Sequence, residues 1–138
     1  MKLIEVVRGH HSSDETISRC LEFTRKLGKT PILVKDVPGF IVNRCARPFY
    51  GEALRLLAEG TATVEDIDNI VRLEGGFKMG PFELMDLIGI DINLAVTRSI
   101  YEQTFGDPRY RPSIVQQEMV HAGHLGRKTK RGFYRYDQ

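Results

Sequence analysis

The sequence predicts a mainly α-helical protein in which a short βαβ unit precedes the helices. β-branched apolar runs of strand length occur only near the beginning of the 138-residue chain. Beyond them, apolar residues recur at spacings of three and four, the helical period, and capping residues divide this pattern into helices. We therefore expect residues 1–36 to be the end of an α/β domain and residues 37–138 to be a separate helical domain.

The first part has the pattern of a strand, a helix and a second strand. Residues 1–7 and residues 31–34 are the two β-branched runs. Between them, Ser12 and Glu15 have the spacing of a capping box, and Gly28 is expected to end the helix. Because two strands do not make a stable sheet by themselves, we expect earlier strands of a larger sheet to be missing and the chain to be cut from a longer protein.

The second part predicts one long helix followed by shorter ones. The long helix should run from Phe40 to Gly60 and should kink at Pro48, since proline removes a backbone hydrogen bond. Capping and breaking residues then delimit shorter helices. One begins at Thr63–Asp66 and ends at Gly75, and the next runs from Pro81 to Leu87. A helix capped by Asp91 should run to Phe105 and one capped by Ser113 to His121, before an extended tail, 132–136.

The composition is that of an ordinary globular protein, with 41% hydrophobic and 28% charged residues. A net charge of +2 gives no argument for a nucleic-acid partner. No apolar run approaches the roughly 20 residues of a membrane span, so no membrane partner is expected. Cys20 and Cys45 lie on the apolar stripes of predicted helices, and we interpret them as buried thiols in a reducing compartment.

Two common kinds of site have no support in the sequence. A dinucleotide-binding loop needs Gly-x-Gly-x-x-Gly between a strand and a helix, whereas Gly75-Gly76 follows a helix and suits a flexible joint. No metal site is expected either. The adjacent side chains of His10-His11 should diverge at a turn, and His121 and His124 lie on either side of a helix end.

Asn43 is a candidate for chemistry because of its place in the predicted fold. The turn Pro38-Gly39 leads from the last strand into the long helix, which puts Asn43 in the first helical turn. Ligands of open α/β sheets bind at the carboxyl ends of strands, and an amide there can donate a hydrogen bond to a carbonyl or alkoxide oxygen. Asparagine near a helix start is more commonly a cap or a surface residue, so those interpretations stay open.

Four segments, in matching order and spacing, resemble the L-3-hydroxyacyl-CoA dehydrogenase family over essentially the whole chain. They are residues 1–7, residues 38–44 (Pro-Gly-Phe-Ile-Val-Asn-Arg), residues 79–91 (Met-Gly-Pro-Phe-Glu-Leu-Met-Asp, with Gly89 and Asp91 beyond) and residues 126–134 (Gly-Arg-Lys-Thr, then Gly-Phe-Tyr). The resemblance implies an oxidoreductase that interconverts 3-hydroxyacyl-CoA and 3-ketoacyl-CoA with NAD, as in fatty-acid β-oxidation. It also implies an N-terminal Rossmann-type domain and a C-terminal helical domain, similar to that of 6-phosphogluconate dehydrogenase, through which the family forms homodimers.

The resemblance assigns roles to three residues. Asn43 matches the asparagine that approaches the 3-oxygen of the substrate, and Glu5 matches the glutamate that pairs with the catalytic histidine. Lys128 matches a lysine of the C-terminal tail that reaches the NAD. The histidine and the dinucleotide loop are not in this sequence, so we expect the isolated chain to be inactive. The family implies a cytoplasmic protein, or one of the mitochondrial matrix in a eukaryote.

Two other functions remain open from the sequence. The chain could be a dimerisation or interaction module without catalysis, which NADH oxidation in the presence of acetoacetyl-CoA would contradict. It could also belong to a related dehydrogenase that acts on a free hydroxy acid such as L-gulonate. The amino-acid sequence of residues 38–44 favours the acyl-CoA branch of the family over this second alternative.

Overall fold

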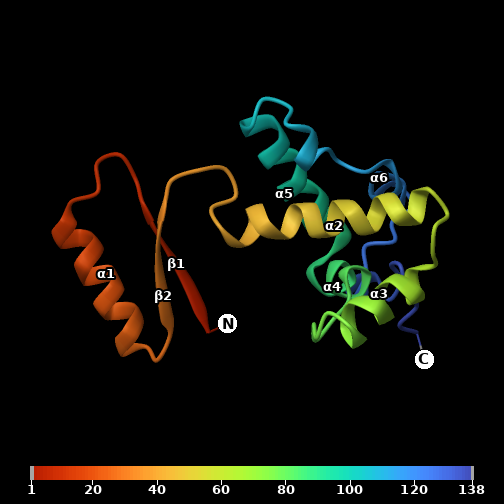
Figure 1. Ribbon diagram of the computed structural model, residues 1–138, viewed down its shortest axis with the longest axis horizontal. Coiled ribbons are helices and arrows are strands. Elements are labelled where there is room, and N and C mark those ends of the chain that lie inside the picture. The colour runs from red at the N-terminus through yellow and green to blue at the C-terminus, as the bar shows by residue number, and fades with distance from the viewer. Residues whose placement is uncertain (1, 138) are drawn as a thin grey trace. The chain divides into compact units, whose positions relative to one another are not determined.

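A computed structural model describes residues 2–137 and divides the chain into two units, Met1–Arg44 and Cys45–Gln138. The first unit contains β1 (Leu3–Arg8), α1 (Asp14–Lys26) and β2 (Thr30–Lys35) (Figure 1). The two strands are parallel, in a register that pairs Leu3 with Thr30 and Arg8 with Lys35. α1 is the crossover that a parallel pair requires. The predicted βαβ unit is therefore confirmed.

The beginning of α1 differs from the predicted capping box. The N-cap is Ser13, whose side chain accepts a hydrogen bond from the backbone N–H of Thr16 at 3.1 Å. Ser12 instead accepts from the backbone N–H of Gly9 at 3.1 Å, which closes the turn after β1. The expectation of a Ser12–Glu15 box was wrong by one residue, because either of two adjacent serines can serve as a cap. Gly28 follows the helix with φ 68°, as expected of a left-handed helix end.

The second unit is built from helices, and the mainly α class is confirmed. α2 (Val42–Ala58) begins within the first unit's range and continues without interruption through Pro48. The others are α3 (Val64–Leu73), α4 (Pro81–Ile88), α5 (Ile90–Gln103), α6 (Ile114–His121) and two single 3-10 turns, η1 (Pro108–Tyr110) and η2 (Arg127–Thr129) (Figure 1). The predicted domain division at residues 36 and 37 stays a prediction.

The core of the second unit lies between α2, α3, α4 and α5. It comprises Tyr50, Ala53, Leu54, Ile67, Phe82, Met85 and Ile90. Thr63 caps α3 as expected, and its partner in the capping box is Asp66. Asp91 was wrongly predicted to cap α5. The N-cap is Gly89 with φ 102°, because α4 and α5 are joined so closely that only glycine fits the turn.

Both cysteines are exposed free thiols, which corrects the prediction that they are buried. α1 packs on only two strands, so its covered stripe is narrow and consists of Ile17 and Thr24, with Cys20 outside it. α2 buries the face that contains Arg47 and Tyr50, and Cys45 lies off that face. Among residues 2–137, no helix is both long and apolar enough to cross a bilayer.

Candidate functional site

The turn before α2 has an unusual backbone. Gly39 has φ 74° and Phe40 has φ 48°, so two successive residues adopt the left-handed region. This conformation costs a non-glycine residue such as Phe40 roughly 1–2 kcal/mol. The turn is held by hydrogen bonds from Phe40 N–H to Val37 O at 3.0 Å and from Arg44 N–H to Gly39 O at 3.1 Å. A defined turn of this kind fixes where Asn43, the second residue of α2, begins its helix.

Glu5 lies against the same helical turn as Asn43. Its Oε1 accepts hydrogen bonds from the backbone N–H of Ile41 at 2.8 Å and of Val42 at 3.2 Å. The first turn of α2 contains no acidic residue of its own, so a carboxylate from β1 serves its unpaired N–H groups and the positive end of its dipole. The structure thus brings two of the three predicted site residues, Glu5 and Asn43, to one turn of the first unit.

The other oxygen of Glu5 is available for a further partner. Within residues 2–137, Oε2 accepts no hydrogen bond, and the Glu5 residue is only partly buried. Because Oε1 is held by two backbone donors, the carboxylate has a fixed orientation. This arrangement can orient an imidazole through Oε2, and it also stabilises the start of α2.

Lys128, the third predicted residue, lies on η2 in the second unit. Its ammonium donates to both carboxylate oxygens of Asp91, at 2.5 Å to Oδ1 and 2.7 Å to Oδ2. The hydrogen bond from Lys128 holds the pKa of the Asp91 carboxyl below its ordinary value. Both side chains are more than a third exposed, at 42% and 35%. The ion pair therefore links the tail to the start of α5 while the ammonium stays accessible.

Replacement of Lys128 by methionine is expected to weaken the fold only at neutral pH. Because the folded pKa of Asp91 lies below the ordinary value of about 3.9, the pair stabilises above about pH 4 and its contribution is lost as the pH falls through the folded pKa. We expect a loss of less than about 1 kcal/mol at pH 7, smaller in high salt, since the pair is exposed. Urea unfolding from pH 2.5 to pH 7 measures this, with the exposed Lys78→Met as control. A deficit that persists at pH 2.5 would contradict the assignment.

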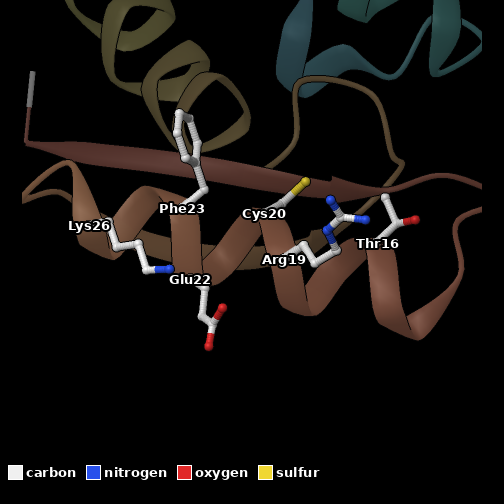
Figure 2. A pocket seen from close by; sticks show the side chains of 6 residues that line it. All are labelled: Thr16, Arg19, Cys20, Glu22, Phe23 and Lys26. Carbon is white, nitrogen blue, oxygen red and sulfur yellow. The ribbon is translucent and has the colours of Figure 1, made fainter.

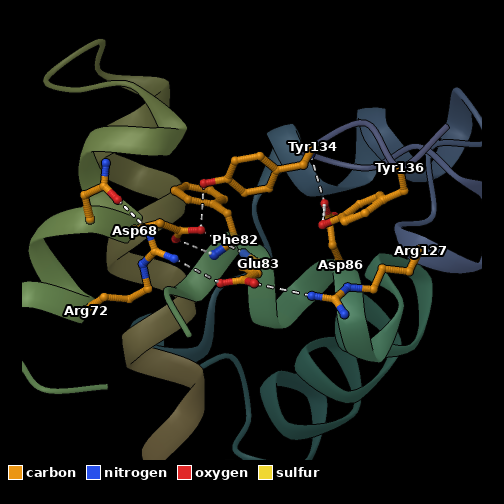
Figure 3. Close-up of polar contacts among 9 residues, drawn as sticks. Asp68, Arg72, Phe82, Glu83, Asp86, Arg127, Tyr134 and Tyr136 are labelled. Atoms are coloured by element: carbon orange, nitrogen blue, oxygen red, sulfur yellow. Dashed lines mark hydrogen bonds and ion pairs between the residues drawn. The ribbon is translucent and has the colours of Figure 1, made fainter. Parts of the chain in front are cut away.

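Asp68 is a structural residue that the sequence did not reveal. The N-cap of α4 is Gly80, which has no side chain to serve as a cap. Asp68, buried on α3, takes that role by accepting from the N–H groups of Phe82 and Glu83, each at 2.9 Å (Figure 3). A side chain at position 80 would collide with Asp68, so glycine is required there. Asp68 also accepts from the hydroxyl of Tyr134 at 2.9 Å.

Asp86 holds the C-terminal tail to α4 in a similar way. It accepts from the N–H groups of Phe133 at 3.0 Å and Tyr134 at 2.9 Å, and from the hydroxyl of Tyr136 at 2.9 Å (Figure 3). Burial raises the pKa of Asp86, although these donors act in the opposite direction. Burial and the hydrogen bond to Asp86 also raise the pKa of Tyr136 to about 12. The tail motif Gly-Phe-Tyr is thus explained by attachment to a buried carboxylate.

Glu83 extends this network to the surface. It forms ion pairs with Arg127 at 3.4 Å and with Arg72 at 3.8 Å (Figure 3). α3, α4 and the tail are therefore joined by charges as well as by the core. The tail turn that contains Lys128 is anchored on both of its sides, by Asp86 and by the Arg127–Glu83 pair.

A hollow of about 480 Å³ on α1 does not have the features of an active site. It is lined by residues of that one helix, which are Thr16, Arg19, Cys20, Glu22, Phe23 and Lys26 (Figure 2). Their side chains do not converge on a common point, as acid–base groups from several elements would. The histidine prediction needs one correction: the rings of His10 and His11 do not diverge but contact each other edge to face, with centroids 4.9 Å apart. Residues 2–137 contain no group of three or more side chains that could hold a metal ion.

A parallel βαβ unit is the building block of dinucleotide-binding Rossmann domains, and here a helical unit follows it in the chain. Comparison with known families agrees with this organisation. Residues 39–136 match the model of the C-terminal domain of 3-hydroxyacyl-CoA dehydrogenase, and residues 1–37 match the model of the NAD-binding domain of the same enzyme. The chain belongs to the 3-hydroxyacyl-CoA dehydrogenase family, and the resemblance found in the sequence is confirmed.

Individual relatives give the same result. The chain is 48% identical to the 3-hydroxyadipyl-CoA dehydrogenase of Escherichia coli, over 97% of this chain and 28% of the relative. It is 46% identical to the probable 3-hydroxybutyryl-CoA dehydrogenase of Deinococcus radiodurans, over 99% of this chain and 49% of the relative. The crystal structure of (S)-3-hydroxybutyryl-CoA dehydrogenase from Ralstonia eutropha matches with a TM-score of 0.95 and 46% identity, over 100% of this chain and 48% of that one. The chain thus spans half or less of these relatives.

Proposed function

We propose that this chain supplies the substrate-side part of an NAD-dependent enzyme that interconverts 3-hydroxyacyl-CoA and 3-ketoacyl-CoA. Family membership and the convergence of Glu5 and Asn43 on one turn support this. The proposal depends on one observation: the carboxylate of Glu5 accepts a hydrogen bond from the backbone N–H of Val42, the residue before Asn43. It relates the first strand to the first turn of α2 across 37 positions of sequence.

The reaction needs a base for the hydroxyl proton and a donor for the oxygen. Oxidation of a secondary alcohol removes its hydroxyl proton as hydride leaves the carbon, and a histidine base contributes about 10²–10⁴-fold. Glu5 would accept a hydrogen bond from that histidine through Oε2, which fixes the tautomer and stabilises the imidazolium. The amide of Asn43 would donate to the 3-oxygen as negative charge develops on it.

NAD, when bound, supplies the acceptor for the hydride. The residues of this chain that fit the dinucleotide are few, because no Gly-x-Gly-x-x-Gly loop is in the sequence. Lys128 fits, because its ammonium is exposed while Asp91 and the tail hold it in place. We propose that Lys128 contributes a positive charge toward the NAD, and that most of the cofactor is bound by polypeptide other than this chain.

We propose that the helical unit forms a homodimer. Several large apolar side chains of that unit are exposed, including Leu73 at 79%, Phe105 at 100% and Ile114 at 69%. Contact with a second copy would remove such surface from water.

We propose a short or medium 3-hydroxyacyl-CoA as the substrate, as in fatty-acid β-oxidation. The proposed compartment is the cytoplasm, or the mitochondrial matrix in a eukaryote, as the name of the pig relative, hydroxyacyl-coenzyme A dehydrogenase, mitochondrial, suggests.

A chimera tests the proposed function. Residues 1–138 replace the matching segment, 48% of the chain, in the Ralstonia eutropha enzyme, so that the remaining polypeptide supplies the histidine and the dinucleotide loop. We expect this chimera to oxidise NADH when acetoacetyl-CoA is present, and the 138-residue chain alone to be inactive. A folded chimera without this activity would argue for a module that does not take part in catalysis.

Replacing Glu5 with glutamine in the chimera should separate its two roles. The side-chain oxygen of glutamine can still accept from Ile41 and Val42, so the thermal midpoint should change little. The amide group, however, presents a donor where an imidazole N–H must be accepted, so kcat should fall at least about tenfold, a part of the 10²–10⁴-fold that a base contributes. Glu22→Gln, on the exposed face of α1, is the matched control. Unchanged turnover of Glu5→Gln would restrict Glu5 to capping α2.

A further inference from the structure

The helical unit buries a guanidinium that has no acidic partner. Arg47, on α2, is only 5% exposed. Its Nη1 donates to Asn93 O at 2.9 Å, to Asn93 Oδ1 at 3.3 Å and to Thr97 Oγ1 at 3.1 Å. The guanidinium also lies over the ring of Tyr50, 4.8 Å from its centroid. All of these groups are neutral, and no carboxylate of residues 2–137 forms an ion pair with Arg47.

One edge of this guanidinium has no use in the fold. Nε of Arg47 is buried without a hydrogen-bond partner, and so is Nδ2 of Asn93. The hydrogen bonds of Arg47 within the described chain all start from Nη1. Nε and Nη2 offer two parallel N–H donors, the edge that binds anions in proteins. Burial lowers the pKa of Arg47, because the guanidinium loses contact with water, and the nearby Tyr50 acts in the opposite direction.

A small cavity adjoins Arg47. Its volume of about 10 Å³ gives room for one atom of about the size of a water molecule. Arg109, Arg111 and Ser113 also line it, and no acidic residue does. Arg109 is already paired with Asp107 at 2.6 Å, whereas Arg111 forms no ion pair among residues 2–137. The lining therefore has an excess of positive charge.

The N-terminus of α6 faces the same cavity. Ser113 is its N-cap, but the serine side chain makes no capping hydrogen bond. The first backbone N–H that bonds within the helix is that of Gln117, to Ser113 O at 3.2 Å, so earlier N–H groups lack a helical acceptor. Both Ser113 and Gln116 line the cavity. An uncapped helix start adds donors and a partial positive charge to those of the arginines.

We propose that this cavity is a binding site for one small monovalent anion of the halide class, held between the Arg47 guanidinium and the start of α6. A halide supplies the charge that Arg47 lacks and accepts from several donors at once. A water molecule fits the volume but leaves the charge unbalanced. A halide ion is somewhat larger than water, and the exposed side chains of Arg109 and Arg111 can move outward to admit it, whereas a polyatomic anion such as phosphate needs several times that space. The bound ion would join α2 to α6 and stabilise the helical unit. This inference goes beyond the proposed enzymatic function and does not depend on it.

Bromide locates the site directly. Crystals of the 138-residue chain, soaked in sodium bromide, are measured by anomalous scattering at the bromine edge. We expect one bromide within hydrogen-bonding distance of Arg47 Nε or Nη2 and of the Ser113–Gln116 segment. A water molecule there, without an anomalous signal, would overturn the proposal, and so would an empty cavity.

Thermal unfolding tests the same site in solution. In chloride, at an ionic strength of about 0.15 M, the midpoint should be roughly 3–8 °C higher than in gluconate, the shift that a tenfold gain in the folding equilibrium gives. Arg47→Met should remove this difference and Arg111→Gln should reduce it, while Arg135→Gln, an exposed arginine away from the cavity, should retain it. If Arg47→Met does not fold, the comparison of Arg111→Gln with Arg135→Gln decides. Equal midpoints of the unmodified chain in both salts would overturn the proposal.

Discussion

In the chimera, replacement of Asn43 by alanine is expected to lower kcat by about 10²–10³-fold, the effect of removing one donor from a developing oxyanion. Binding of acyl-CoA should change much less, because the donor acts mainly on the charge that appears in the transition state. Steady-state rates of NADH oxidation at several acetoacetyl-CoA concentrations give kcat and KM. Because Asn43 is the second residue of α2 and the turn is held by backbone bonds, the substitution should leave the fold intact.

A second asparagine provides the control for this experiment. Asn69 lies on α3, and its side-chain oxygen accepts from Arg72 at 2.6 Å, on the exposed side of the helix. Asn69→Ala in the same chimera should leave kcat within about twofold, as expected of a surface substitution worth less than about 0.5 kcal/mol. Equal kcat values of Asn43→Ala and the unmodified chimera would show that Asn43 has no catalytic role and is only a residue of the helix.

Loss of the Asp86 carboxylate is expected to cause the largest fall in stability. Asp86→Ala leaves the N–H groups of Phe133 and Tyr134 and the hydroxyl of Tyr136 without their acceptor. Bonds to a charged group contribute about 1.5–3 kcal/mol each, and the contributions are not additive, so we expect a total loss of about 3–5 kcal/mol. The tail should detach from α4 first. Urea unfolding gives the free energy, and tyrosine fluorescence or hydrogen exchange of residues 126–136 reports the tail.

Two further variants show whether the acceptor itself is responsible. Asp36→Ala removes an exposed aspartate of the first unit and should change the free energy of unfolding by less than about 0.5 kcal/mol. Asp86→Asn keeps one acceptor oxygen and nearly the same volume, so it should lie between Asp86→Ala and the unmodified chain. A loss of less than about 1 kcal/mol for Asp86→Ala would show that the tail is held by its aromatic rings instead of by this carboxylate.

The parts of the fold that could be predicted are those with local signals. The partners of the capping box, Thr63 and Asp66, are three positions apart, and Gly28 ends its helix by its own conformational freedom. The start of α2 near Asn43 follows from the turn at Pro38-Gly39, which is also a local feature. In each case the residues that determine the structure are neighbours in sequence, so a short pattern contains the whole cause.

The features that the sequence did not predict depend on contacts between segments that are distant in the chain. Asp68 binds N–H groups 14 and 15 residues away, and Asp86 binds groups 47 to 50 residues away, so no short window contains both partners. An aspartate amid apolar helix residues was the available signal for both. The prediction that Cys20 is buried was wrong for a related reason. An apolar stripe on a helix does not show how many strands of a sheet cover it. The burial of Arg47 has no signal in the sequence, because arginine side chains are mostly exposed.

A crystal structure of the chimera with NAD and acetoacetyl-CoA tests most directly whether Glu5 and Asn43 serve one active site. We predict that Glu5 Oε2 lies within hydrogen-bonding distance, about 2.6–3.2 Å, of an imidazole nitrogen supplied by the Ralstonia part, and that the Asn43 amide lies within the same range of the substrate 3-oxygen. If the imidazole instead pairs elsewhere while Glu5 only caps α2, and the Asn43 amide lies away from the 3-oxygen, the proposed site is contradicted.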